Sequence, residues 1–242
     1  MREIEKDPKP GIPFNMIEGM MPKYPMIALV GWMFVLIAFL VGLFVFSPAQ
    51  ATFLSDAKAI REAASAGSAF VDANVSRHVI EAWLPQFKFV GLGLSLMAIT
   101  MALGTIAKKL RHMGKVIAAH MPANLAPPTP PIPGRVRIFQ LSTMMGIMIL
   151  LAALIVGIVL ATGVVPDYWS HSIASALNPA AAGSALLDQL ASVSSYAKWL
   201  NPLRILGMGF LFTGITVALT VIIGTLRLQA GMLVQFYQKA SG

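Results

Sequence analysis

The sequence has no cysteine and few charges: charged residues make up 12% of its 242 positions, whereas 57% are hydrophobic. The absence of cysteine excludes disulfides and thiolate metal sites. Soluble domains carry about 25% charged residues, so the charge content of this chain is low for a soluble fold. The composition therefore predicts an integral membrane protein.

Four stretches of the chain lack Asp, Glu, Lys, Arg and His altogether. An α-helix rises about 1.5 Å per residue, so about 20 apolar residues cross a hydrocarbon core about 30 Å thick. We therefore predict an all-α integral membrane protein with four transmembrane helices. Ion-coupled transport and haem binding are disfavoured, because they use ionisable residues or histidines within the spans. The stretches are residues 25–46, 89–107, 138–165 and 205–226.

Small residues after the first stretch, from Pro48 to Ala51, have the pattern of a signal-peptide cleavage site. The apolar core of a signal peptide is about 7–15 residues long, which is shorter than this stretch. A segment of 24 residues with balanced charges also precedes it. We therefore expect the first stretch to remain in the protein as a transmembrane helix.

The net charge of +8 is confined to the loop between the second and third stretches and to the C-terminal tail. Cytoplasmic loops of membrane proteins are enriched in Lys and Arg. We therefore expect both regions, and both termini, on the cytoplasmic side of a cell inner membrane. No nucleic acid is expected as a partner, because aromatic residues do not interleave with these charges. The excess charges are Lys108, Lys109, Arg111, Lys115, Arg135, Arg137, Arg227 and Lys239.

The phrase AGSAFVD at residues 66–72 returns as AGSALLD at residues 182–188, an offset of 116 residues. Between residues 66–103 and 182–219, 14 of 38 positions are identical, including Trp83 with Trp199. This similarity indicates a duplication in which each copy holds two spans. Because that number is even, both copies have the same orientation, with a pseudo-twofold axis along the membrane normal.

Each copy of the phrase is suited to begin a helix outside the membrane. Gly67 and Gly183 allow a sharp turn, and Ser68 and Ser184 are suitable N-caps. We expect helical periplasmic segments at residues 49–87 and 166–203. The expected organisation is a cytoplasmic N-terminal segment (1–24), a first two-span repeat (25–121), a Pro-rich cytoplasmic linker (122–137), a second two-span repeat (138–229) and a cytoplasmic tail (230–242).

Small residues at helical spacing within the spans predict faces for helix packing, because they allow close van der Waals contact in lipid. The glycine pairs Gly91/Gly93 and Gly207/Gly209 carry an alternative interpretation, in which a lipid, a quinone or a partner helix contacts the backbone; no other cofactor is predicted. The predicted packing residues are Gly91, Gly93, Thr100, Gly104, Ala153, Gly157, Gly207, Gly209, Thr216, Thr220 and Gly224.

One constellation outside the spans has the residue types of a metal site. Asp167 and His171 are four residues apart in DYWSH, and His78 lies on the other outer segment. Imidazole and carboxylate are common metal ligands, so these three residues are candidate ligands of an outer-face metal. The methionines of the spans could bind copper, because thioethers suit Cu(I). This hypothesis is weaker, since Met more often fills gaps in apolar cores.

No nucleotide-binding loop, nucleophile elbow or HExxH motif is present, and no catalytic residue is predicted. The expected function is a non-catalytic structural or accessory subunit of a larger inner-membrane protein complex. Its expected partners are other integral membrane subunits and lipids, and a homo-oligomer is left open. The alternatives are a transporter or channel subunit with a pathway between protomers, and a subunit with an outer-face metal or copper site.

Overall fold

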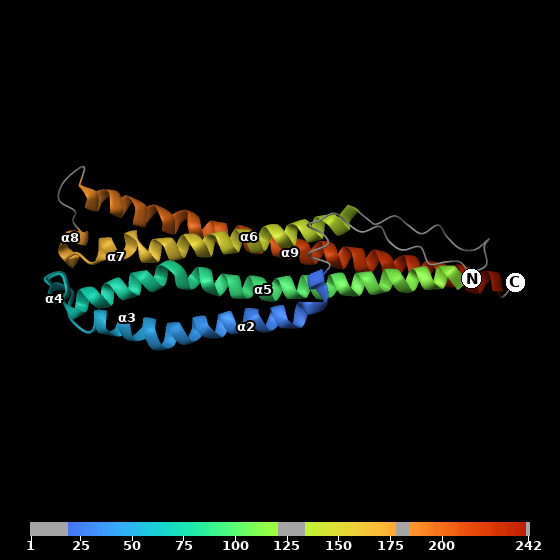
Figure 1. Ribbon diagram of the computed structural model, residues 1–242, viewed down its shortest axis with the longest axis horizontal. Coiled ribbons are helices and arrows are strands. Elements are labelled where there is room, and N and C mark those ends of the chain that lie inside the picture. Colours follow the sequence, from blue (N-terminus) through green and yellow to red (C-terminus); the bar gives the residue numbers. More distant parts are fainter. Residues whose placement is uncertain (1–18, 121–133, 178–183, 241–242) are drawn as a thin grey trace. The chain divides into compact units, whose positions relative to one another are not determined.

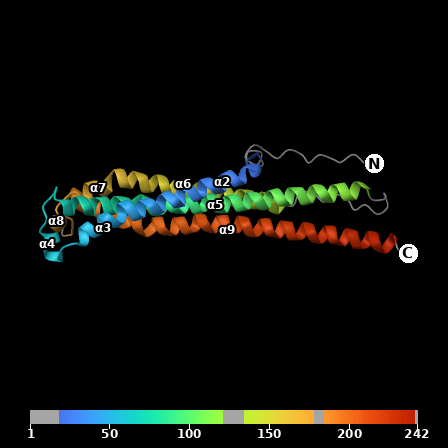
Figure 2. The same ribbon diagram turned by 90° about the horizontal axis from the view of Figure 1, so that it is seen from below.

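The computed structural model describes residues 19–120, 134–177 and 184–240, and every regular element within them is helical (Figures 1 and 2). The predicted N-terminal segment and Pro-rich linker lie largely outside these residues. In chain order the elements are the 3-10 helix η1 (Met21–Lys23), α2 (Tyr24–Val41), the π-helix η2 (Gly42–Phe46), α3 (Ser47–Leu54), α4 (Lys58–Glu62), α5 (Ala69–His120), α6 (Gly134–Thr162), α7 (Val164–Trp169), α8 (Ile173–Leu177) and α9 (Ala185–Ala240).

Four helical stretches among the described residues are long and apolar enough to cross a membrane. They are Met21–Leu54, Ala69–Ala119, Gly134–Trp169 and Ala185–Gln238. Each contains one of the charge-free stretches found in the sequence. The prediction of an all-helical protein with four potential spans is therefore confirmed for the described part of the chain.

Helices α5 and α9 are longer than a membrane is thick, and Figure 1 shows each as one continuous ribbon. They contain 52 and 56 residues. At about 1.5 Å per residue, each helix exceeds a hydrocarbon core about 30 Å thick more than twofold. Pro85 and Pro202 lie inside these helices without ending them. Both helices therefore extend well beyond their charge-free stretches.

The described part of the repeated phrase lies at the start of both long helices, and the predicted turn at Gly183 lies outside the described residues. Helix α5 begins at Ala69 and α9 at Ala185, which are 116 residues apart. Gly67 has a positive φ of 76°, which confirms the sharp turn predicted there. The Ser184 hydroxyl accepts a hydrogen bond from the Leu187 N–H at 3.4 Å, as expected of an N-cap. Ser68 also directly precedes its helix, and its carbonyl accepts from the Asp72 N–H at 2.9 Å, but its buried hydroxyl has no hydrogen-bond partner among the described residues, so the predicted side-chain cap is not formed there.

The chain divides into two compact units. Unit 1 comprises Met1–Leu29, Ser95–Gly146 and Gly209–Gly242. Its core is a cluster of apolar side chains from η1, α5, α6 and α9: Met21, Met101, Phe139 and Ala218. Further along α5 and α9, the Gln229 side-chain amide donates a hydrogen bond to the Leu110 carbonyl. This bond ties together the parts of the two helices that lie beyond their charge-free stretches.

Unit 2 comprises Val30–Leu94 and Ile147–Met208. It has two buried apolar clusters, one of Phe53, Val71 and Ile173 and the other of Ala82, Ala161 and Val165. The Tyr168 hydroxyl donates a hydrogen bond to the Ala176 carbonyl and so connects α7 with α8. The first cluster thus joins α3, α5 and α8, and the second joins α5, α6 and α7.

Candidate functional site

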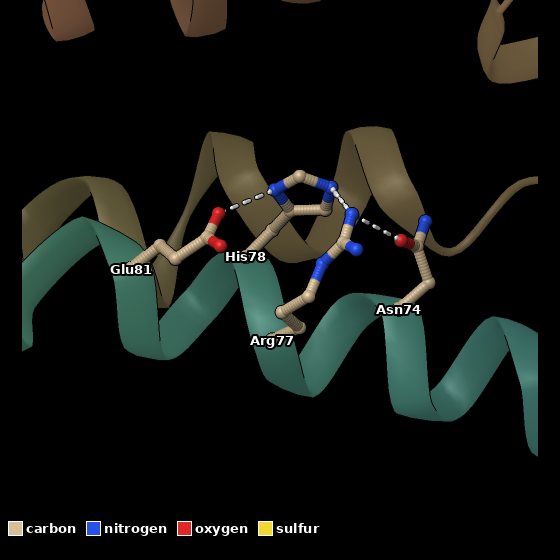
Figure 3. A network of polar contacts seen from close by, with 4 residues as sticks. All are labelled: Asn74, Arg77, His78 and Glu81. Atoms are coloured by element: carbon tan, nitrogen blue, oxygen red, sulfur yellow. Dashed lines mark hydrogen bonds and ion pairs between the residues drawn. The ribbon is translucent and has the colours of Figure 1, made fainter. Parts of the chain in front are cut away.

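A network of four polar side chains lies along one face of α5 in unit 2 (Figure 3). Asn74, Arg77, His78 and Glu81 have the spacing i, i+3, i+4 and i+7, which places side chains on one helix face. Arg77 Nη2 lies 3.2 Å from Asn74 Oδ1 and 3.0 Å from His78 Nε2. His78 Nδ1 lies 3.1 Å from Glu81 Oε2. The four side chains therefore form one continuous chain of contacts.

The arginine determines the tautomer of His78 in this network. A guanidinium donates hydrogen bonds and never accepts them, so His78 Nε2 accepts from Arg77 and Nδ1 carries the proton donated to Glu81. The hydrogen bond from His78 is the largest cause that lowers the pKa of the Glu81 carboxyl from its ordinary value of 4.5. Glu81 lies near the start of α5, eight residues before the charge-free stretch at residues 89–107.

Helix α7 covers the network with aromatic rings. The Trp169 ring stacks on the His78 ring with centroids 3.8 Å apart and planes at 9°. Tyr168 meets Trp169 edge-on, with centroids 4.9 Å apart. Asn74 is 1% exposed, so one end of the network is fully buried. The network and the ring stack together fix α5 against α7.

The predicted metal ligands are not brought together around one point in the described residues. Both ring nitrogens of His78 are engaged, one by Glu81 and the other by Arg77. No group of three or more His, Cys, Asp or Glu side chains that could hold a metal ion lies in the part of the chain that the structure describes. An outer-face metal therefore stays a prediction from the sequence.

The end of α7 explains the placement of His171. A spacing of four residues brings Asp167 and His171 together on one helix face only if the helix runs through both, and α7 ends at Trp169. His171 Nδ1 lies 3.0 Å from the Asp167 carbonyl oxygen and 3.3 Å from that of Tyr168. Carbonyls at a helix C-terminus lack intrahelical partners, and an imidazole N–H satisfies them. The ring therefore caps α7 through backbone atoms.

Several predicted packing residues face other helices of the same chain. A Cβ atom added at Gly91 would lie 2.8 Å from Phe34 Cβ and 2.9 Å from the Gly31 carbonyl oxygen, so α2 fills the space that a lipid or quinone would need there. At Gly104 an added Cβ would lie 3.1 Å from the Met21 side chain. The remaining buried members of the predicted set are Gly93, Thr100, Ala153, Gly157 and Gly207.

The other predicted packing residues lie on an exposed face of α9. Gly209, Thr216, Thr220 and Gly224 are exposed, and a Cβ added at Gly209 or Gly224 would have no neighbour within 4 Å. Thr213 is also exposed and shares their helical spacing. The buried residues Leu211, Gly214 and Ala218 lie on the opposite side of the helix. We call the exposed set, Gly209, Thr213, Thr216, Thr220 and Gly224, the α9 outer face.

The threonines of the α9 outer face satisfy their own hydroxyls. Thr213, Thr216 and Thr220 donate to the carbonyl oxygens four residues earlier at 2.9 Å, 3.0 Å and 2.9 Å. Such bonds leave no free donor toward lipid. The face is therefore a shallow surface of small side chains whose polar hydrogens are already bound.

One polar pair in unit 2 is not predictable from the motifs in the sequence. Arg204 Nη1 donates to Gln86 Oε1 at 3.1 Å, and Gln86 is 3% exposed. Arg204 Nη2 also donates to Asn201 Oδ1 at 2.9 Å, and its guanidinium lies 5.0 Å from the centroid of the Phe89 ring. Lys88 and Arg204 are 116 residues apart, the offset of the repeated phrase, so the repeat marks a basic position there, but nothing in the sequence marks Gln86 as the partner of Arg204.

Comparisons with protein families, with curated proteins and with solved structures find no match to this chain.

Proposed function

We propose that this chain is a non-catalytic structural or accessory subunit of a larger inner-membrane protein complex. In this proposal the α9 outer face binds a transmembrane helix of another integral membrane subunit. Two two-span repeats of parallel orientation form the membrane part, with helical periplasmic segments and with both termini cytoplasmic. The supports are the 116-residue offset between the starts of α5 and α9 and the placement of the excess positive charge.

The observation that carries the proposal is the contrast between the two sets of small residues. Gly91, Gly104 and Gly157 contact other helices of this chain, whereas Gly209 and Gly224 have open space beside them. In lipid, helix association depends on van der Waals packing at small residues, since lipid tails are as apolar as leucine. A row of small residues that no other described helix of this chain covers favours contact with a helix of a partner subunit.

The α9 outer face also differs from an ordinary lipid-facing surface in its residue types. Its members follow one another at intervals of three or four residues, so they form one stripe along the helix. Large apolar side chains that are 55% and 44% exposed, Phe212 and Leu219, border the stripe. A shallow groove of Gly and Thr beside bulky residues suits a crossing helix that inserts its own side chains.

The test is purification of the native complex in mild detergent, followed by identification of its components. We expect the wild type to purify with membrane partners in stoichiometric amounts. The Thr220→Leu variant should lose them, because the bulky side chain prevents close approach of the partner helix to α9. Thr220→Val is the matched control, since it keeps the shape and removes only the hydroxyl, and it should retain the partners. A wild-type chain without partners, or equal recovery of partners with Thr220→Leu, would contradict the proposal. A complex containing only copies of this chain would identify the partner as a second protomer.

A further inference from the structure

Two arginines of unit 2 converge on one aromatic ring. The guanidinium carbon of Arg61, on α4, lies 4.9 Å from the centroid of the Phe53 ring, and that of Arg77, on α5, lies 4.5 Å from it. The two cations are therefore separated by no more than the sum of these distances. Phe53 itself is buried against Val71 and Ile173. The fold thus holds two like charges against one buried aromatic ring.

The carboxylates next to these arginines form their close ion pairs with other groups, and Arg77 acts on Glu81 only at longer range. Glu62 pairs with Lys58 at 3.5 Å, and Glu81 pairs with His78 at 3.1 Å. The acceptors of Arg77 Nη2 are the uncharged side chains of Asn74 and His78. Among the described residues, neither guanidinium has a carboxylate in ion-pair contact. Two like charges held together in this way favour a bound anion.

Three hydrogen-bond donors lack acceptors: two belong to the arginines over the Phe53 ring, and the third lies just before α5 begins. Arg61 Nε and Arg77 Nε are buried without a partner in the described part of the chain, and so is the hydroxyl of Ser68. Ser68 lies one turn before Val71, which packs on Phe53. Native proteins rarely bury polar groups unpaired, and a bound water or ion is a common reason where they do. An oxyanion is the species that offers acceptors to all three donors.

The arginine pair belongs to one half of the sequence only. At the offset of 116 residues, Arg61 corresponds to Leu177 and Arg77 corresponds to Val193. The residues that begin the long helix are kept in both halves, but the two cations are not. The start of a long helix therefore does not need the two arginines, and their presence has another cause.

We infer that Arg61 and Arg77 bind a phosphate group beside Phe53. Guanidinium matches the geometry of phosphate oxygens and binds them through paired N–H donors, and two arginines complement its multiple negative charge. The phosphate has two chemical sources, a phospholipid headgroup or free phosphate. Phe53 follows the charge-free stretch at residues 25–46 by seven residues, about 10 Å along a helix, which is close to headgroup depth. This site is independent of the α9 outer face.

The experiment uses the full chain, delipidated in a sugar-based detergent, and isothermal titration with inorganic phosphate at constant ionic strength. We expect saturable binding that Arg61→Gln and Arg77→Gln each weaken about tenfold or more. Lys58→Gln is the matched control, because it removes an equal charge from the same short helix and should leave the affinity unchanged. Arg61→Lys, which keeps the charge, should bind with intermediate affinity, and this variant separates loss of the site from loss of the fold.

Native mass spectrometry of the chain before delipidation distinguishes the two sources. A phospholipid retained by the wild type and lost from Arg61→Gln identifies a lipid headgroup as the ligand. Inorganic phosphate binding without a retained lipid identifies free phosphate. The inference is overturned if the wild type shows neither, or if Lys58→Gln reduces binding and lipid retention as much as Arg61→Gln does.

Discussion

A Cβ atom added at Gly157 would lie 2.8 Å from the carbonyl oxygen of Ala82. Helix α6 therefore approaches the backbone of α5 at this point, and the side chain of Gln86 lies beside the same contact at 3.1 Å. The sequence marks Gly157 as a packing residue. The structure shows that its partner is this chain itself, so Gly157 stabilises unit 2.

Gly157→Ala should destabilise the chain by about 1–3 kcal/mol, because the added methyl overpacks a contact with backbone that cannot move aside. Thermal unfolding of the purified chain in detergent measures this. Gly224→Ala is the matched control, since a Cβ there meets nothing within 4 Å, and its melting temperature should be close to that of the wild type. Equal melting temperatures for both variants would show that the α5–α6 contact is looser than described.

The four spans and the starts of the long helices are predictable because they depend on local sequence. A charge-free apolar stretch forms a helix in lipid, where every backbone group needs an internal partner. Gly67 precedes α5 at the predicted turn, with a positive φ. These features need no knowledge of what packs where.

The partners of polar side chains are not predictable in the same way. His78 and Asp167 have the residue types of a metal site, but His78 pairs with Glu81 three residues away and stacks on Trp169 from another helix. Gln86 meets Arg204 across 118 positions of sequence. Such pairings depend on the rotation of each helix about its axis, which hydrophobicity alone does not fix. The same limit applies to the packing residues, where the sequence cannot separate Gly157 from Gly224.

Gln86→Leu should destabilise unit 2 by about 1–3 kcal/mol, because it leaves a partly buried donor of Arg204 without its acceptor. A double-mutant cycle with Arg204→Leu measures the coupling between them. The double variant should lose less stability than the two single variants lose in sum, since neither the Arg204 guanidinium nor the Gln86 amide is then left without its partner. Strictly additive effects would mean that the 3.1 Å contact contributes nothing to stability.

The stability contributed by Glu81 should depend on pH. Its pKa is lowered in the folded chain, chiefly by the hydrogen bond from His78. A carboxyl with a lowered folded-state pKa stabilises the fold above its unfolded-state pKa, and this contribution is lost as the pH falls through the folded value. Wild type and Glu81→Gln should therefore differ in melting temperature at neutral pH and converge below pH 4.5. A constant difference across this range would contradict the role given to the carboxylate.

Asp167→Ala and His171→Ala should leave assembly unchanged and lower the melting temperature only slightly, because both side chains are exposed and the cap that His171 provides ends a helix of 6 residues. His78→Ala should lower the melting temperature, since it removes the stack on Trp169 and the partner of Glu81. Addition of a chelator should change the melting temperature of neither the wild type nor the variants. If a chelator lowers the melting temperature of the wild type but of none of the three variants, the outer-face metal site would instead be established.

The last prediction concerns orientation in the membrane. All of the excess positive charge lies in the central loop and the C-terminal tail, so both should be cytoplasmic, with α4 on the other side. The chain has no cysteine, and Ile60 and Leu233 are 54% and 52% exposed, so single Ile60→Cys and Leu233→Cys variants carry accessible thiols. An impermeant thiol reagent added to intact cells with a permeable outer envelope should label position 60 and leave position 233 unlabelled. Both should react once the inner membrane is opened, and labelling of position 233 alone in intact cells would reverse the assignment.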